Sequence, residues 1–233
     1  MGKLEQKDFN IDNYENFYSD HYFLEMSDDM AFNAHRGIPR VAWAVDVAEE
    51  LEPESVLDLG CLEGFTLLTL CNKVPSIKRG VGVDLSADGI RLANRRKDLL
   101  KADVSFIQDT VENYLENCNE KFDLICLFEV IEHVKDPDYV IKLMDKVLSD
   151  KGQILISTPS FESPAYGKND VQNKCHIRLY TTKDEDYEEM TDIPDPDTGK
   201  CYMRTATSMP KQIGQDRILD MRVYSHLINV RYK

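Results

Sequence analysis

Residues 56–64 read Val-Leu-Asp-Leu-Gly-Cys-Leu-Glu-Gly, and the pattern of this stretch decides the fold. An apolar run ends in an acidic residue and two glycines, and a helical pattern begins at once with Phe65. This order predicts a buried strand that turns tightly into a helix. Gly60 and Gly64 carry no Cβ and would let the backbone approach a ligand, towards which the free amides of the helix start would also point. The turn is therefore a candidate binding site.

The alternation of strand and helix continues along the chain. Apolar runs predict strands at 55–59, 80–84, 104–107, 122–128 and 153–158. Helical patterns follow them at 64–73, 87–101, 110–116 and 138–149, the last ending before Gly152. This alternation predicts an α/β fold with a doubly wound, mostly parallel sheet. Ligands of such sheets bind beyond the carboxyl ends of the strands, where the sequence places Asp58–Gly60, Asp84, Asp109 and Glu129.

The flanking regions are expected to complete this domain. Residues 1–50 are predicted to form an N-terminal extension with interleaved aromatics, in which a helix runs from about Asp28 to Glu50 and restarts at Pro39. Residues 51–233 form the main domain, with a ligand-binding core at 51–160 and an acceptor side at 161–233. The tail would supply two final strands, at 201–208 and 218–232, and the acidic run 184–197 is expected to be a solvated face or loop.

Net charge, hydropathy and cysteine spacing limit the kinds of molecule and the cellular location that are expected for this chain. The formal net charge of −14 over 233 residues counts against broad nucleic-acid binding, which depends on basic side chains. No apolar run approaches the roughly 18 residues of a membrane span, and the polar N-terminus has no signal-peptide core. The six cysteines have no Cys-x-x-Cys spacing and favour free thiols over disulfides, so a cytoplasmic location is expected. The sequence carries no indication of oligomeric state.

The turn can be compared with known nucleotide-binding patterns. A dinucleotide fingerprint starting at Gly60 would need glycines where Leu62 and Phe65 stand, and no Gly-Lys-Ser/Thr follows for a phosphate loop. The stretch resembles motif I of the class I S-adenosylmethionine (SAM) methyltransferases, Asp/Glu-x-Gly-x-Gly-x-Gly. Asp58, Gly60 and Gly64 match this motif, and Leu62 replaces its middle glycine. The resemblance implies SAM as cofactor, and the alternative is a strand, turn and helix without a ligand.

The SAM reading assigns roles to the acids at the strand ends. Asp84 could accept hydrogen bonds from a ribose diol, or it could cap the next helix, although Ser86 already fills that position. Asp109 resembles the family's adenine-contacting acid and could equally cap the helix starting at 110. Asp58 would approach the methionine end, while Glu63 and Phe65 could line the turn or face solvent and core respectively. The predicted cofactor set comprises Asp58, Gly60, Cys61, Gly64, Asp84, Leu85, Asp109 and Phe128.

The stretch Phe128-Glu129-Val130-Ile131-Glu132-His133-Val134 is the sharpest local feature. If it begins a helix, Glu129, Glu132 and His133 share one face. Burying such groups is costly unless they bind something. His176 follows the fifth strand and could complete a cage of two Glu and two His. This donor set suits Mn²⁺, Fe²⁺, Co²⁺ or Zn²⁺ better than Mg²⁺, and a metal there would lower the pKa of an acceptor hydroxyl.

The same element resembles two methyltransferase groups. One is the ubiquinone-biosynthesis O-methyltransferases, and the other is the small-RNA 3′-terminal 2′-O-methyltransferases, whose metal ligands are Glu-x-x-Glu-His and a later His. The resemblance covers about residues 50–182 and carries metal ligation onto Glu129, Glu132, His133 and His176. A metal-free alternative has His133 as general base, and a third reading makes Glu132 and His133 an exposed helix start. His21, His35 and His226 have no such setting and are expected to be ordinary histidines.

The sequence thus predicts a SAM-dependent methyltransferase that methylates oxygen, with His133 and Glu132 as catalytic residues and a divalent metal as a second cofactor. The acidic balance favours a small-molecule or saccharide acceptor. The alternatives are an RNA 3′-terminal 2′-O-methyltransferase and a non-catalytic SAM-binding partner subunit. The N-terminal aromatics could form a lid or a strip packed on the sheet. Arg36, Arg40 and Arg178 could hold an anionic substrate group or make salt bridges.

Overall fold

The computed structural model describes residues 27–162, 176–190, 203–224 and 227–233. A seven-stranded sheet with the order β3-β2-β1-β4-β5-β10-β9 forms its centre. The strands are β1 (Ser55–Leu59), β2 (Arg79–Asp84), β3 (Asp103–Gln108), β4 (Phe122–Phe128), β5 (Leu148–Pro159), β9 (Ile218–Tyr224) and β10 (Leu227–Tyr232). The first five run parallel, and β10 is antiparallel to both β5 and β9. The predicted doubly wound sheet is confirmed.

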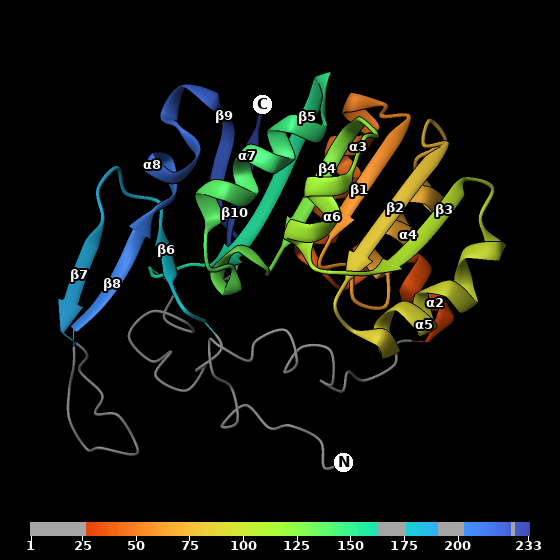
Figure 1. The fold of residues 1–233 in the computed structure, drawn as a ribbon, viewed down its shortest axis with the longest axis horizontal. Coiled ribbons are helices and arrows are strands. Elements are labelled where there is room, and N and C mark those ends of the chain that lie inside the picture. The colour runs from red at the N-terminus through yellow and green to blue at the C-terminus, as the bar shows by residue number, and fades with distance from the viewer. Residues whose placement is uncertain (1–26, 163–175, 191–202, 225–226) are drawn as a thin grey trace, which may run out of the picture.

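Helices cover both faces of this sheet (Figure 1). They are α2 (Asp28–Phe32), α3 (Pro39–Leu51), α4 (Phe65–Lys73), α5 (Ala87–Arg96), α6 (Val111–Asn117), α7 (Pro137–Val147) and α8 (Met209–Ile213), with short 3₁₀ turns η3 (Ala34–Arg36), η4 (Lys97–Leu99), η5 (Ile131–His133) and η6 (Gln215–Arg217). Within the described ranges, no helix is long and apolar enough to cross a bilayer.

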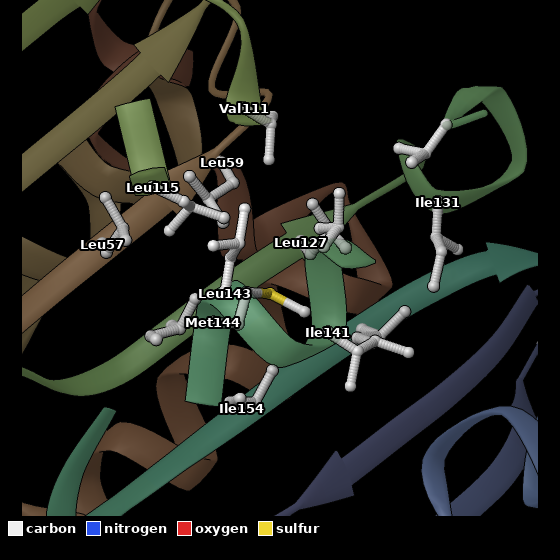
Figure 2. Close-up of a cluster of buried hydrophobic side chains, with 14 of the residues drawn as sticks. Leu57, Leu59, Val111, Leu115, Leu127, Ile131, Ile141, Leu143, Met144 and Ile154 are labelled. Atoms are coloured by element: carbon white, nitrogen blue, oxygen red, sulfur yellow. The ribbon is translucent and has the colours of Figure 1, made fainter. Parts of the chain in front are cut away.

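Alternating residues of β4 show how the two cores form. Ile125 and Leu127 belong to a cluster with α6 and α7, drawn in part in Figure 2, whereas Leu124, Cys126 and Phe128 belong to a cluster with α3, α4 and α5. Successive side chains of a strand point to opposite faces, so an apolar strand of this kind must be covered on both sides. The strand order reverses between β1 and β4, and this switch point is where the carboxyl ends leave room for a ligand.

Polar residues set the helix starts. The hydroxyls of Ser86 and Thr110 accept hydrogen bonds from backbone N–H groups in the first turns of α5 and α6, and Asp136 does the same for α7. Pro39 begins α3, as predicted. The helix predicted at 87–101 is shorter, because it ends at Arg96 and continues only as the 3₁₀ turn η4.

Two boundaries after β4 differ from the prediction. The helix ends at Val147, and β5 starts at Leu148 rather than after Gly152. Gly152 lies inside the strand, where an added Cβ would stand 2.7 Å from Leu148 Cδ1 and 2.9 Å from the Phe122 carbonyl oxygen. The glycine therefore reflects close strand packing and not a helix stop.

The C-terminal region also differs from the prediction of two final strands. Three strands are present, and the first of them, β8 (Met203–Ser208), leaves the main sheet and pairs with β6 (Leu179–Thr181) and β7 (Tyr187–Met190). This small sheet lies beside α8, far from β3 (Figure 1). Part of the acidic run thus forms β7 instead of a loop. The N-terminal aromatics lie outside the described residues, and the division at residues 50 and 160 stays a prediction.

The cysteines follow the free-thiol prediction where the structure describes them. Cys61, Cys71, Cys118 and Cys126 form no disulfide. Burial raises the pKa of the Cys61 and Cys126 thiols, with nearby carboxylates adding to the effect. Such thiols are inert and belong to the core.

Candidate active site

A cavity of about 300 Å³ opens at the carboxyl ends of β1, β2 and β4. Seven of the eight predicted cofactor residues line it, all except Gly64, and they are joined by Glu129 and His133. The lining residues are Arg40, Asp58, Gly60, Cys61, Leu62, Phe65, Thr66, Asp84, Leu85, Asp109, Val111, Glu112, Phe128, Glu129, Val130, His133 and Val134. The structure therefore brings the glycine turn and the Glu-x-x-Glu-His element to one hollow.

The glycine turn adopts left-handed backbone at Gly60 (φ 74°), Leu62 (φ 52°) and Gly64 (φ 81°). Open space for a ligand does not explain the two glycines. A Cβ at Gly60 would collide with Val130 Cγ2, and one at Gly64 would stand 2.7 Å from the Phe106 ring. Both glycines are needed because protein side chains occupy the space next to them, in addition to their positive φ. The contact with Val130 also draws the turn against the Glu-x-x-Glu-His element.

Asp84 fixes the turn from the end of β2. Its Oδ2 accepts a hydrogen bond of 2.8 Å from the Leu62 N–H, and its Oδ1 accepts one of 2.8 Å from the Ser86 N–H. The hydroxyl of Ser86 is the cap of α5, so the capping role considered for Asp84 is excluded. Burial raises the pKa of Asp84, although these N–H groups oppose the effect. Each oxygen keeps a further lone pair that can accept from a diol.

Asp109, which follows β3, also lines the cavity. Thr110 caps α6, while Asp109 accepts hydrogen bonds from the Thr110 N–H at 2.8 Å and from Asn113 Nδ2 at 2.8 and 2.9 Å. The carboxylate is thus held in place beside the helix start without being the cap residue itself.

Asp58 lies at the base of the cavity and is only 2% exposed. Its Oδ2 has no hydrogen-bond partner among the described residues. Burial raises its pKa to about 7, and the backbone N–H of Leu67 and the charge of Arg40 only partly oppose this. A carboxyl group that is uncharged or half-charged near neutral pH beside a cavity is a common sign of a functional site.

The Glu-x-x-Glu-His element is not the start of an α-helix. Glu129 has a left-handed φ of 58°, and only the 3₁₀ turn η5 follows. The Glu129 N–H donates to the Ser157 carbonyl oxygen at 2.9 Å, and Ser157 Oγ donates to Glu129 Oε1 at 2.9 Å. The predicted helical face is therefore wrong, and β5 holds Glu129 in a conformation that few residues other than glycine adopt.

Glu132, His133 and His176 form a group of metal-ligating residue types that could hold an ion. One ligand atom from each lies within 4.8 Å of the others, and the two imidazole rings are 4.9 Å apart. Glu132 is 1% exposed, so the exposed-helix reading is also wrong. Its Oε2 accepts from Thr158 Oγ1 at 3.0 Å, whereas its Oε1 is buried without a hydrogen-bond partner among the described residues. Glu129 is not a member of this group.

The segment carrying His176 is fixed by backbone contacts. The Ile177 N–H donates to the Glu132 carbonyl oxygen at 3.1 Å. Arg178 donates to the carbonyl oxygens of Val134 and Lys135, so its guanidinium holds the segment that carries His176 against the segment that follows η5. Burial raises the pKa of Glu132 well above its usual range, and the nearby charge of Glu129 adds to the effect.

The two other arginines considered for substrate binding, Arg36 and Arg40, lie in different surroundings, and so do the turn residues Glu63 and Phe65. Arg36 lies 3.9 Å from Asp29, and Arg40 lines the cavity. Glu63 does not face solvent, since it is 2% exposed and pairs with buried Arg96 at 2.8 Å. Phe65 lines the cavity instead of joining the core.

Several lining residues were not predicted, namely Leu62, Thr66, Val111, Glu112, Val130 and Val134. Leu62 stands where the motif has its middle glycine, and it has a positive φ, a conformation that glycine adopts readily. Its position in the motif was therefore a signal that sequence reasoning could have used. The other five residues line the cavity only because α4, α6 and η5 pack against the strand ends. Local sequence does not reveal that packing.

Comparison with known proteins identifies the family. The family model described as a methyltransferase domain matches residues 52–205. A ubiquinone biosynthesis O-methyltransferase of Glaesserella parasuis is 30% identical over 131 residues, which are 54% of each chain. This chain therefore spans about half the length of that relative. The chain belongs to the methyltransferase-domain family.

Solved structures agree on the fold. A SAM-dependent methyltransferase from Clostridium acetobutylicum superposes with a TM-score of 0.56 at 18% identity, over 88% of this chain and 96% of that one. An O-methyltransferase family protein from Burkholderia thailandensis has a TM-score of 0.59 at 16% identity, over 88% of this chain and 57% of that one. The fold is that of the Rossmann-like class I SAM-dependent methyltransferases.

Proposed function

We propose that this chain transfers the methyl group of SAM to a hydroxyl oxygen of a small molecule. The observation that carries the proposal is the shared cavity, in which Asp58, Gly60 and Asp84 lie with Glu129 and His133. In this proposal Asp84 and Asp109 would accept hydrogen bonds from the nucleoside, and Asp58 would lie towards the methionine end. The relative named a ubiquinone biosynthesis O-methyltransferase supports oxygen as the acceptor atom.

The reaction is a displacement at the sulfonium methyl carbon. The acceptor oxygen forms the new C–O bond as the C–S bond breaks, so that S-adenosylhomocysteine (SAH) leaves with the electron pair. The hydroxyl proton must leave as well, and His133, whose imidazole lines the cavity, would accept it. Alignment of oxygen, carbon and sulfur within the hollow would supply a large part of the rate.

The residues present also fit a divalent metal. Glu132, His133 and His176 offer one carboxylate oxygen and two imidazole nitrogens within 4.8 Å, and Glu132 Oε1 is a buried acceptor that lacks a hydrogen-bond donor in the described residues. Such a donor set suits Mn²⁺, Fe²⁺, Co²⁺ or Zn²⁺. When bound, the ion would supply Lewis-acid activation of the acceptor hydroxyl. Glu129, which accepts a hydrogen bond from Ser157, is close enough for its charge to raise the pKa of Glu132 and would be a further carboxylate near the ion.

The test separates cofactor binding from metal dependence. SAM is titrated calorimetrically into the full chain, into Asp84→Asn and into a matched control, Asp88→Asn, whose side chain is exposed and contacts Arg91. We expect Asp84→Asn to raise the dissociation constant about 10- to 100-fold, because a charged acceptor is lost. Asp88→Asn should leave it unchanged. Absence of SAM binding to the unmodified chain would contradict the proposal.

Elemental analysis of the purified chain, with and without chelator, tests the metal. A divalent ion present in stoichiometric amount and lost in Glu132→Gln is the expected result. If no ion is found and chelators leave methyl transfer unchanged, the metal-free mechanism with His133 as base is preferred.

A further inference from the structure

Arg96, the last residue of α5, is a buried cation that contacts two carboxylates. Its Nη1 donates to Glu63 Oε2 at 2.8 Å, and its Nε donates to Asp28 Oδ1 at 2.9 Å. Glu63 lies in the glycine turn and is as deeply buried as Arg96, whereas Asp28 begins α2 and is largely exposed. One guanidinium therefore connects three segments that are distant in sequence, namely α2, the glycine turn and α5, and α2 lies beside α5 (Figure 1).

Stability alone does not explain why the pair of Glu63 and Arg96 is buried. Taking two charges out of water costs free energy that their attraction only partly returns, and apolar side chains of similar volume often stabilise a fold equally well. One attested use of a buried ion pair is to specify one conformation over its alternatives. Glu63 lies between Leu62 and Gly64, which both have left-handed backbone, and for a leucine this conformation costs free energy. The segment that Arg96 holds is therefore one whose conformation needs support.

The unit formed by β2 and α5 holds the glycine turn at three points. Asp84, at the end of β2, accepts a hydrogen bond from the Leu62 N–H at 2.8 Å. Gly89, in the first turn of α5, lies so close that an added Cβ would stand 2.9 Å from the Leu62 carbonyl oxygen. Arg96, at the other end of α5, holds the Glu63 side chain. The turn cannot shift relative to β2 and α5 without disturbing one of these contacts.

The held turn is one wall of the cavity described above. The turn residues that line this cavity are Gly60, Cys61, Leu62 and Phe65, whereas Glu63 and Arg96 are not among the lining residues. The ion pair can therefore affect a bound molecule only through the position of the turn. A binding site that is already rigid before the ligand arrives avoids the free-energy cost of ordering it on binding.

We propose that Arg96 is a positioning residue for SAM binding, which keeps the glycine turn in its binding conformation through Glu63. Asp28 holds the guanidinium from the other side, so Arg96 also ties α2 to the cofactor-binding turn. This proposal rests on the proposed function, since it takes the cavity as the SAM site. The acceptor side of the cavity, with Glu129 and His133, is not part of this arrangement.

The test removes the ion pair while keeping the buried volume filled. Glu63→Met/Arg96→Met removes both charges, and Arg96→Lys keeps the cation but loses the planar fork that can reach two carboxylates. The matched control is Arg91→Met, in the same helix, which breaks an exposed pair with Asp88. SAM is titrated calorimetrically into the full chain and into each variant. Circular dichroism and urea denaturation without SAM report folding and stability.

We expect the double variant to bind SAM about tenfold more weakly, with an unfolding free energy equal to or above that of the unmodified chain. A merely structural role for Arg96 would lower affinity and stability together or leave both unchanged. Arg96→Lys should keep part of the affinity, with a loss of about threefold, because one carboxylate can still be paired. Arg91→Met should bind SAM normally.

The proposal is overturned if the double variant binds SAM within about twofold of the unmodified chain, or if Arg91→Met loses as much affinity as the double variant. If the double variant does not fold, Arg96→Lys decides, and an unchanged affinity for SAM overturns the proposal. Failure of the proposed function would look different, because the unmodified chain would then bind no SAM. Normal SAM binding in all variants overturns only the role of Arg96.

Discussion

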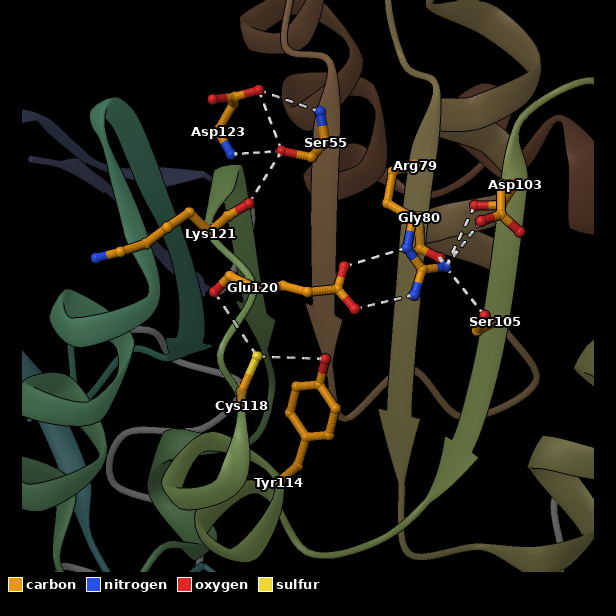
Figure 3. A network of polar contacts seen from close by, with 10 residues as sticks. All are labelled: Ser55, Arg79, Gly80, Asp103, Ser105, Tyr114, Cys118, Glu120, Lys121 and Asp123. Carbon is orange, nitrogen blue, oxygen red and sulfur yellow. Dashed lines mark hydrogen bonds and ion pairs between the residues drawn. The ribbon is translucent and has the colours of Figure 1, made fainter.

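Two aspartates at opposite edges of the parallel sheet, Asp123 and Asp58, differ in how fully their carboxylate oxygens are hydrogen-bonded. At the amino edge (Figure 3), Asp123 at the start of β4 accepts hydrogen bonds from the Glu54 N–H and from the N–H and Oγ of Ser55, while its other oxygen accepts from Ser149 Oγ at 2.8 Å. At the carboxyl edge, Asp58 at the end of neighbouring β1 has a buried Oδ2 with no partner in the described part of the chain.

Their acidities diverge accordingly. Burial alone would raise the pKa of Asp123, but the donors from Ser149, Glu54 and Ser55 lower it below the usual value. Burial raises the pKa of Asp58 to about 7. The amino edge uses its polar groups to join strands, whereas the carboxyl edge has two buried carboxylate oxygens, Asp58 Oδ2 and Glu132 Oε1, with no hydrogen-bond partner in the described residues. Unpaired buried acceptors and a raised pKa are both common at functional sites, so this difference indicates that the carboxyl edge binds a ligand.

The largest expected effect is a loss of methyl transfer when a side chain of the carboxyl edge is removed. His133→Ala should reduce methyl transfer about 100- to 10,000-fold, because the proton-accepting imidazole beside the cavity is lost. SAM affinity should change little, since His133 belongs to the acceptor side. Steady-state rates and a SAM titration check both statements. Glu120→Gln, at the amino edge, is the control and should keep full activity; a His133→Ala enzyme within threefold of the unmodified rate would contradict the assignment.

The second effect concerns stability against pH. The pKa of Asp58 is raised by burial, so its contribution to stability is fully present below the ordinary value of 3.8 and is lost as pH rises through about 7. Asp58→Asn removes this dependence. The unfolding free energy of the variant relative to the unmodified chain should rise by about 3 kcal/mol between pH 5 and pH 8. Urea denaturation of the SAM-free chain at both pH values measures this, and a constant difference would show that Asp58 is ionised throughout.

Asp123→Asn should give the opposite sign. Because the pKa of Asp123 is lowered in the folded chain, its stabilisation is present above the ordinary value and is lost as pH falls through the folded value. The variant should be less stable by about 2 kcal/mol at pH 7, since hydrogen bonds to a charged acceptor are weakened, and the deficit should shrink towards pH 3. Methyl transfer should be unaffected. A loss of activity without a loss of stability would mean that the two edges are coupled.

Much of this comparison could be predicted from sequence. The strands β1 to β4 and the helix starts at Ser86 and Pro39 follow from apolar runs and capping residues, which act over a few positions. The start of β5 at Leu148 and the pairing of β8 outside the main sheet could not be predicted. Both depend on contacts between distant segments, such as Gly152 against Phe122.

The sequence predicted part of the cavity lining, but it did not predict the backbone conformation of those residues. The motif placed Asp58, Gly60 and Asp84 together because the strand ends of a parallel sheet meet at one edge. The helical face expected for Glu129, Glu132 and His133 failed, since hydrogen bonds from β5 hold Glu129 at a positive φ. The role of the two glycines was likewise decided by Val130 and Phe106, which are distant in sequence.

The smallest expected effect is at the amino edge, where Arg79 pairs with Glu120 through two contacts of 3.2 and 3.3 Å. Glu120 is half exposed, so solvent screens the pair, and a double-mutant cycle of Arg79→Met and Glu120→Gln should give a coupling of about 0.5 kcal/mol at low salt. The coupling should decrease further at 1 M salt, a concentration at which the screening length is about 3 Å. Arg79 also donates to Ser105 Oγ at 3.0 Å, and that bond should persist in Glu120→Gln. A coupling above about 2 kcal/mol would mean that solvent does not screen this ion pair and that it behaves as a buried one. The amino edge would then hold strong electrostatic interactions, as the carboxyl edge does.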